Sequence, residues 1–395
     1  MNREMIRLFL ESAARTHAAT TAAVGKIAGE IHSSSDYLLT GGTRISDAGA
    51  TAVHALEDPA RLLAPTSAQR IKALALLCES GFPSTRTVSV RGDLDWRTSV
   101  DLHLALENIS RDTGSVKDRA ARLLWHQVKD LTPGTRCVIA SSGNHGIAYA
   151  RSCLESGVAL TVVVPRNTSQ LKVTKLENYG ATVIRHGETW DQAYDYAKQF
   201  VRDTESHLLD LDAPESVAAL GTVVHEMLFR HPDTDAIVLP GGGGTIMTGA
   251  QIVREFEEMS GRQYLVLGAC PADSPTLAKS LETGIPRTAE ANTIAEAMKV
   301  ETVPVHLFGQ IRTGVDDIIT VPDRDIERGV VLLSDAVGHP VEAAGAVGAM
   351  AVLRNDGLVH GVFGDYDLRD KKVVTVVTGG NISSEDIDFY RRKHF

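Results

Sequence analysis

Residues 239–250, LPGGGGTIMTGA, place four consecutive glycines between an apolar segment typical of a strand and a predicted helix that begins near Thr245. Four residues without side chains are costly to order, so a simple turn rarely contains them. A run of backbone N–H groups at the start of a helix, in contrast, is well suited to hold an anion. The segment therefore predicts a phosphate-binding loop after a strand of an α/β fold.

Two nucleotide-binding motifs do not fit this loop. The spacing from Gly244 to Gly249 imitates a P-loop, but the next two residues are Ala and Gln where that motif requires Lys and Ser or Thr. A dinucleotide-binding fingerprint fails as well, because Ile246 or Met247 falls at its third glycine position. The phosphate is therefore expected to belong to another kind of ligand.

Short apolar segments alternate with helical stretches from about residue 98 onward, which predicts parallel strands joined by crossover helices. Because 395 residues are too many for a single core, we expect two lobes, each with a largely parallel, twisted sheet flanked by helices. The predicted strands are 99–106, 135–140, 160–165, 181–186, 206–211, 235–240, 264–269, 316–321 and 372–378.

The first 95 residues differ from the rest, since they are rich in Ala, Ser and Thr with helical spacing and no clear strand rhythm. We interpret residues 1–95 as a helical N-terminal extension that packs on the large lobe. Two later helix starts are marked by Ser216, a residue typical of a helix cap, and by the acid-rich segment 322–325.

Composition excludes several classes of protein. The 40 basic and 50 acidic side chains give a net charge of −10 with no basic stripe, so we expect no nucleic-acid partner. No apolar run approaches the length of a membrane helix, so we expect no membrane partner. The N-terminal segment contains Glu4 and Glu11 and lacks the features of a secretory signal, which favours a cytoplasmic location.

Cysteines and histidines indicate no metal site. The four cysteines are widely spaced, without CxxC pairs, and are expected to be reduced and buried. His225-Glu226 is followed by Phe229, where a zinc metalloprotease helix needs its second histidine.

Lys117 lies in DTGSVKDRAARLL (112–124), in the first turn of a predicted helix after a turn-forming Thr-Gly-Ser. The positive end of a helix disfavours a protonated amine. That environment suits an amine that must form an imine and later act as a base. Taken alone, a solvated surface lysine is the more common interpretation.

A second anion site is predicted in ASSGNHGIAYA (140–150), between a strand and the following helix. Its small residues allow backbone N–H groups to converge at the helix start. The side chains of Ser141, Ser142, Asn144 and His145 add hydroxyl, amide and imidazole groups. A loop that only turns and caps is the competing interpretation.

In their order, these segments resemble the pyridoxal 5′-phosphate (PLP) enzymes of fold type II, the tryptophan synthase β group, and within it the serine/threonine dehydratase and serine racemase family. The resemblance covers about residues 98–395. The matching segments are LENISRDTGSVKDRAA (106–121), ASSGNHG (140–146), PRNTSQLKVTKLENYGATVIRHG (165–187), ALGTVVHEML (219–228), PGGGG (240–244), TIAEAMKV (293–300), HPVEAAGA (339–346) and VTGGNIS (377–383).

The resemblance implies PLP as the cofactor, a large PLP-binding domain of residues 96–126 and 211–395, and a small mobile domain of residues 127–210. Lys117 would form the Schiff base, Asn144 would bond the phenolic oxygen, Glu342 would lie near the ring, and Thr378 would bond the pyridine nitrogen. A neutral hydroxyl at that nitrogen weakens the electron sink, which favours loss of a β-substituent over transamination. The implied phosphate loop is Gly241, Gly242, Gly243, Gly244 and Thr245.

The resemblance also implies a small amino acid substrate. Its carboxylate would bind to Ser141, Ser142, Gly143, Asn144 and His145. Lys117 and Ser142 would be catalytic, with Ser142 at the position that faces the α-carbon opposite the lysine in the racemases. We expect β-elimination from a hydroxy amino acid such as L-threonine or L-serine, giving a 2-oxo acid and ammonia, in a homodimer.

Departures from the family pattern leave more than one activity open, and an N-terminal arm of about 95 residues, longer than usual and without a clear TPL segment, leaves the substrate open. Val116 replaces the usual phenylalanine, and Asp118-Arg119 is more typical of cysteine synthases, so the chain could be a β-replacement synthase. Cys270 stands where metal-binding members carry a glutamate, so no divalent cation is expected. An amino acid racemase and an inactive PLP-fold binding protein also stay open as interpretations of the sequence.

Overall fold

The computed structural model describes residues 85–395 except 95, 111–112, 125–127, 129–130, 133, 142, 211–212 and 259–261. The described residues all belong to one compact unit, Leu76–Phe395. Most of the predicted N-terminal extension therefore lies outside the described residues.

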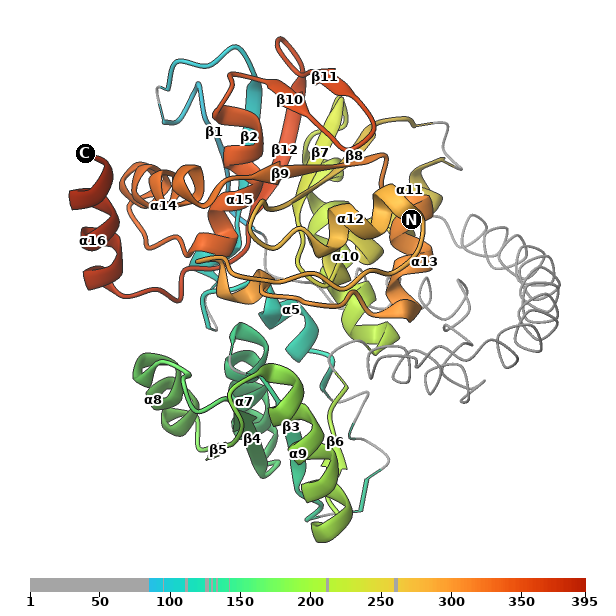
Figure 1. Ribbon diagram of the computed structural model, residues 1–395, viewed down its shortest axis with the longest axis vertical. Helices are drawn as coiled ribbons and strands as arrows, with labels where there is room; N and C mark the ends of the chain where they lie inside the picture. The colour runs from blue at the N-terminus through green and yellow to red at the C-terminus, as the bar shows by residue number, and fades with distance from the viewer. Residues whose placement is uncertain are drawn as a thin grey trace, which may run out of the picture. The chain divides into compact units, whose positions relative to one another are not determined.

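The larger sheet has six strands in the order β1-β2-β12-β7-β8-β9 (Figure 1). Every neighbouring pair is parallel except β1 and β2. The strands are β1 (Thr87–Ser89), β2 (Asp101–Leu106), β7 (Ala236–Pro240), β8 (Leu265–Pro271), β9 (Asp317–Val321) and β12 (Lys372–Val377). All except β1 were predicted from the apolar segments.

Helices cover both faces of this sheet, which explains why its central strands are apolar without alternation. Every residue of β7 is buried, and α15 (Ala343–Leu353), which packs against β7, β8 and β12, is buried over almost its whole length. The other long helices of this part are α10 (Pro214–Arg230), α11 (Thr245–Glu258), α12 (Thr276–Thr283), α13 (Val305–Gly314), α14 (Asp323–Val337) and α16 (Ser384–His394).

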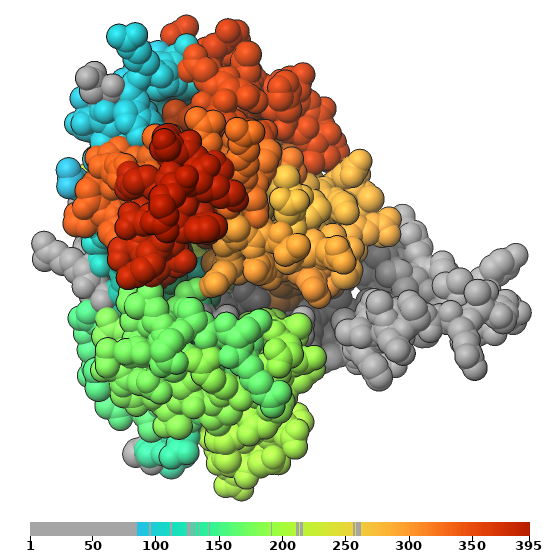
Figure 2. All heavy atoms as spheres, turned by 60° about the vertical axis from the view of Figure 1, so that its left-hand side comes forward, coloured from blue at the N-terminus to red at the C-terminus, as the bar shows by residue number. Residues whose placement is uncertain are grey.

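The smaller sheet has four parallel strands in the order β5-β4-β3-β6. They are β3 (Cys137–Ala140), β4 (Leu160–Val164), β5 (Thr182–Arg185) and β6 (His207–Leu208). The sheet packs with α7 (Asn144–Ser156), α8 (Gln170–Asn178) and α9 (Trp190–Thr204). Figure 2 shows these residues, in green, gathered into one continuous part. The α/β fold with two largely parallel sheets is therefore confirmed.

Two local expectations were wrong, and one element had not been expected. Strand β1 falls in the segment predicted to be helical, and it pairs with β2. Helix α10 begins at Pro214 rather than after Ser216, because proline suits the first turn of a helix; the Ser216 hydroxyl lies 3.0 Å from the Tyr149 hydroxyl instead. The hairpin of β10 (Leu358–His360) and β11 (Asp365–Asp367) was not predicted.

The loop of this hairpin is held by one buried carboxylate. Asp317 accepts hydrogen bonds from the backbone N–H of Val362 at 2.8 Å and of Phe363 at 3.0 Å, and from the Tyr366 hydroxyl at 3.1 Å. Such contacts satisfy a buried charge and place the loop at the start of β9. They link residues almost 50 positions apart in the chain, so no local pattern indicates them.

Two further expectations can be compared with the described residues. Cys137, Cys153 and Cys270 are free and buried, as predicted, whereas Cys78 lies outside these residues. In the part of the chain that the structure describes, no helix has both the length and the apolar character needed to cross a bilayer.

Helices α10 and α11 cross at two glycines, and this crossing generates a prediction. A Cβ atom on Gly249 would lie 2.6 Å from the Gly221 nitrogen and 2.8 Å from the Val217 carbonyl oxygen. We expect Gly249→Ala to lower the free energy of unfolding by about 1–3 kcal/mol, because neither backbone can yield easily. The shift of the urea unfolding midpoint measures this loss.

The matched control is Gly309→Ala on α13, where an added Cβ meets nothing within 4 Å. That change is expected to leave the midpoint unchanged or raise it, since alanine is favoured over glycine inside a helix by about 1 kcal/mol. Equal effects of the two substitutions would contradict the close crossing.

Candidate active site

The predicted site residues gather at one edge of the six-stranded sheet. Strands β2, β12 and β7 are parallel and adjacent, with Val377 paired to Leu106 and Thr375 paired to Val238. The segments that follow these strands therefore start at the same edge. They lead to Lys117, Thr378 and the four-glycine loop, which is the edge where open α/β sheets bind ligands.

Lys117 is the first residue of α5 (Lys117–Ala121), and the backbone before it is tied to the segment after β12. The N–H of Val116 donates to the carbonyl of Thr378 at 2.8 Å, and the N–H of Gly380 donates to the carbonyl of Gly114 at 3.0 Å. Gly114 has a φ of +76°, which favours glycine. Lys117 is half-buried and occupies a defined position beside Thr378.

Asp118 stabilises the turn before the lysine. Its carboxylate accepts from the Ser110 hydroxyl at 2.5 Å, from the Thr113 N–H at 2.9 Å, and from the Thr113 hydroxyl. The side chain is buried, so these charge-assisted bonds also compensate for its lost hydration.

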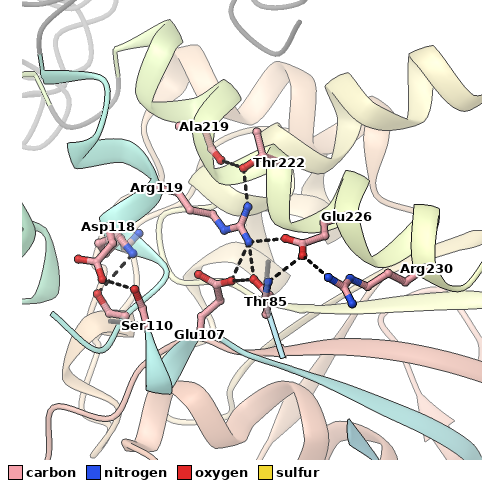
Figure 3. A network of polar contacts seen from close by, with 11 residues as sticks. Thr85, Glu107, Ser110, Asp118, Arg119, Ala219, Thr222, Glu226 and Arg230 are labelled. Carbon is pink, nitrogen blue, oxygen red and sulfur yellow. Dashed lines mark hydrogen bonds and ion pairs between the residues drawn. The ribbon is translucent and has the colours of Figure 1, made fainter. Parts of the chain in front are cut away.

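Arg119 fixes α5 to the sheet through a buried network (Figure 3). Its guanidinium donates to Glu107 and to Glu226 at 2.8 Å each, and to the hydroxyls of Thr222 at 2.8 Å and Thr85 at 2.5 Å. Glu107 follows β2 directly and Glu226 lies on α10, so the network joins three elements behind the lysine. Sequence reasoning assigned no role to Glu107 or Glu226.

Asn144, the first residue of α7, contacts the six-stranded part of the chain. Its amide nitrogen donates to Glu342 Oε1 at 2.6 Å, and its amide oxygen accepts from the Asn381 amide at 2.8 Å. A Cβ atom on Gly379 would collide with Glu342 Oε1 and lie 2.8 Å from Asn144 Nδ2. The glycine at this position therefore gives the space in which Asn144 meets Glu342.

Burial drives two titratable side chains of the site toward their neutral forms. It lowers the pKa of His145 far below the ordinary value, and the ammonium of Lys117 lowers it further. Burial raises the pKa of Glu342, although Lys172 and the Asn144 hydrogen bond act against this rise. His145 Nε2 is buried and has no hydrogen-bond partner among the described residues.

Close packing requires three of the four glycines. A Cβ on Gly241 would collide with Met247, one on Gly242 would lie 2.8 Å from Met298 Cα, and one on Gly244 would collide with Ile311. Gly244 also has a φ of +89°. At Gly243 the nearest atom, on Pro304, is 3.9 Å away, an ordinary van der Waals distance, so a Cβ atom would fit there. Close packing thus explains three of the glycines and does not explain Gly243.

In the second predicted anion loop, the hydroxyl of Ser141 caps α7. It accepts from the N–H of Gly146 at 3.0 Å and of Gly143 at 3.4 Å. Gly143 is the N-cap residue with extended backbone, and His145 follows in the first turn. Ser142 lies outside the described residues. The loop thus has the capping role that was the competing interpretation, and the anion site stays a prediction.

The side chains that sequence reasoning missed belong mainly to α8 and to the segment after β12. Lys175 donates to the Asn381 amide oxygen at 2.5 Å, and Lys172 pairs with Glu296. Both lysines and Asn381 lie in segments that showed the family resemblance, but their spacing alone did not indicate these contacts.

Cys270 is buried at the end of β8, and burial raises the pKa of its thiol to about 12. A thiol that stays protonated is a poor metal ligand. Among the described residues, no group of three or more His, Cys, Asp or Glu side chains is placed to hold a metal ion.

Comparison with known proteins agrees with the family resemblance that the sequence motifs showed. The family model for pyridoxal-phosphate dependent enzymes matches residues 93–379. An L-threonine ammonia-lyase of Thermotoga maritima is 30% identical over 74% of this chain and 70% of its own length. An L-threo-3-hydroxyaspartate ammonia-lyase of Saccharomyces cerevisiae is 27% identical over 73% of this chain and 85% of its own length.

Solved structures show the same fold. The processed form of threonine deaminase isoform 2 of Solanum lycopersicum has a TM-score of 0.71 at 20% identity, over 82% of this chain and 88% of that one. Maize serine racemase has a TM-score of 0.70 at 22% identity, over 82% and 97% of the two chains. These likenesses concern the fold alone.

The buried Arg119 network generates a prediction on stability. Arg119→Met removes the cation and leaves Glu107 buried without it, so we expect a loss of about 3–5 kcal/mol in the free energy of unfolding. The control is Arg230→Met, which removes a more exposed partner of Glu226, 3.1 Å away, and is expected to cost less than about 1 kcal/mol. Urea unfolding midpoints that shift equally would rule out the anchoring role of Arg119.

Proposed function

The chain belongs to the family of pyridoxal-phosphate dependent enzymes, and we propose on this basis that it is an ammonia-lyase for a small hydroxy amino acid such as L-threonine or L-serine. In this reaction β-elimination removes water from the substrate, and hydrolysis of the released enamine then takes up water and frees ammonia, giving a 2-oxo acid. The observation that carries the proposal is the position of Lys117 beside Thr378, within electrostatic reach of His145 and Glu342, in a chain similar to ammonia-lyases.

The residues of the site fit PLP. Gly243, which close packing does not require to be a glycine, and the start of the 14-residue helix α11 suit a phosphate group. Thr245 opens that helix, and Lys117, Asn144, Glu342 and Thr378 supply the amine, amide, carboxyl and hydroxyl groups implied for the ring. The cofactor, when bound, withdraws electrons from the α-carbon of the substrate.

Lys117 is proposed to take the α-proton of the substrate, and the loop from Ser141 to His145 is proposed to hold the substrate carboxylate. The neutral imidazole of His145 suits this place, because its buried Nε2 is available for a hydrogen bond and adds no charge beside Lys117. Ser142 keeps its proposed place opposite the lysine as an expectation drawn from the sequence.

The competing activities differ in support. Asp118 and Arg119, which suggested a β-replacement synthase, are both occupied in buried contacts that hold the turn and the helix. Their presence therefore carries no argument for addition of a nucleophile. Racemisation depends on Ser142 and is a secondary candidate, and an inactive binding protein is disfavoured by the PLP-compatible side chains.

Three broader properties complete the proposal. We propose that residues 127–210 form the small mobile domain and residues 96–126 and 211–395 the large one, consistent with the two separate sheets. A homodimer is proposed, and exposed Phe229 and Phe389 are large apolar side chains that a partner could cover. The reduced, buried cysteines agree with the proposed cytoplasmic location.

Attachment of the cofactor gives a direct spectroscopic prediction. Protein purified with PLP is expected to show a visible absorption band from the linkage to Lys117, and Lys117→Ala is expected to lose it. Lys279→Ala, at an exposed lysine on α12, is the control and should keep the band. A band that persists in Lys117→Ala would refute Lys117 as the attachment point.

The reaction is tested by measuring 2-oxo acid formation from L-threonine, L-serine and L-threo-3-hydroxyaspartate. We expect product from at least one of them, with Lys117→Ala at least about a hundredfold slower because the base is missing. If no hydroxy amino acid gives a 2-oxo acid, the ammonia-lyase proposal fails. A thioether amino acid that forms with an added thiol, in place of the 2-oxo acid, indicates β-replacement. Conversion of L-serine to D-serine that is abolished by Ser142→Ala indicates racemisation.

A further inference from the structure

A chain of hydrogen bonds runs from Lys175 to Glu342 through two amide side chains. Lys175 Nζ donates to Asn381 Oδ1 at 2.5 Å. The Asn381 amide nitrogen donates to Asn144 Oδ1 at 2.8 Å, and the Asn144 amide nitrogen donates to Glu342 Oε1 at 2.6 Å. Its four side chains come from α8, α7, the segment after β12 and the N-cap position of α15.

Lys175, the first member of this hydrogen-bond chain, determines which way the amide groups of the other members point. An ammonium group can only donate hydrogen bonds, so the oxygen of the Asn381 amide must face Lys175. Both hydrogens of the Asn381 nitrogen are then used, one by Asn144 and one by the Thr113 carbonyl oxygen at 3.1 Å. Reversing this amide would place its oxygen against two other oxygens and its nitrogen against the ammonium.

The orientation passes on to Asn144. Because its oxygen accepts from Asn381, its nitrogen faces Glu342, which uses one of the two amide hydrogens. The second hydrogen has no acceptor among the residues that the structure describes, so it can donate to a ligand. Asn144 thus offers a donor at this point of the site, which suits the phenolic oxygen of PLP.

We infer that Lys175 and Asn381 are positioning residues that keep the Asn144 amide oriented as a donor toward the cofactor. The inference rests on the cofactor role of Asn144 in the proposed function. Lys175 and Asn144 lie on α8 and α7, whereas Asn381 and Glu342 belong to the six-stranded part. The amide is therefore oriented only while these two parts of the chain are in contact.

Lys172 on the same helix provides a matched comparison. Its ammonium acts on the buried Glu342 carboxyl and pairs with Glu296, a residue outside the hydrogen-bond chain. Lys172→Met therefore removes a positive charge near the site without removing a donor or an acceptor from the hydrogen-bond chain. Lys175→Met removes a positive charge and the donor at the start of the chain.

The test measures how strongly the apoprotein binds 4-deoxypyridoxine 5′-phosphate, a PLP analogue that keeps the phenolic oxygen and phosphate but cannot link to Lys117. We expect Lys175→Met and Asn381→Asp each to weaken this binding on the order of tenfold, the loss of one oriented hydrogen bond. Lys175→Arg, which restores a charged donor, is expected to recover most of the affinity, and Lys172→Met to change it less than about threefold.

Unchanged affinity in the folded Lys175→Met and Asn381→Asp proteins overturns the inference. If Lys175→Met affects only the KM for L-threo-3-hydroxyaspartate and not the binding of the analogue, Lys175 contacts the second carboxylate of that substrate instead, which also overturns it. A general structural role predicts a lower thermal midpoint without rescue by Lys175→Arg, and this outcome counts against the inference in the same way. Because the binding assay needs no turnover, it decides the question even if the ammonia-lyase proposal fails.

Discussion

The short backbone pairing between residues 114–116 and residues 378–380 is the contact on which the site depends. It joins the turn before α5 to the segment after the central strand β12, so Lys117 and Thr378 keep a constant separation. Glu342 is connected to the same segment, since its N–H donates to the Gly379 carbonyl at 3.0 Å. The sheet therefore acts as a rigid base for three of the proposed cofactor contacts.

The short helix α5 would hold this position poorly by itself, because five residues are too few for a stable isolated helix. Its two polar residues after the lysine compensate for this weakness. Asp118 closes the preceding turn, and Arg119 forms ion pairs with Glu107 and Glu226 in a buried region. Asp118 and Arg119, which suggested a β-replacement synthase, are thus explained by their contacts that hold Lys117 in place.

The periodic features of the fold could be predicted from the sequence, whereas the polar contacts could not. Buried parallel strands appear in the sequence as short unbroken apolar segments, and the order of the motifs agrees with their meeting at one sheet edge. Strand β1 has only three residues and gives no such segment. Lys175 and Asn381 are 206 positions apart, and their contact depends on how α8 approaches the six-stranded part. The glycine loop was predicted as a ligand site, but packing against Met247, Met298 and Ile311 accounts for most of its glycines.

The electrostatic character of the site follows from the same burial that gives it shape. Desolvation raises the pKa of Glu342 and lowers that of His145, so burial acts against a full charge on either side chain. The groups that remain polar are amides, hydroxyls and helix starts, which bind anions by direction rather than by net charge. Both PLP and an amino acid carboxylate are anionic, and a site of this kind can hold them without pairing the lysine amine that must stay reactive. Such a site binds its ligands well only if each neutral group points in the right direction. The Asn144 amide meets this requirement, because the Lys175 ammonium sets its direction through Asn381.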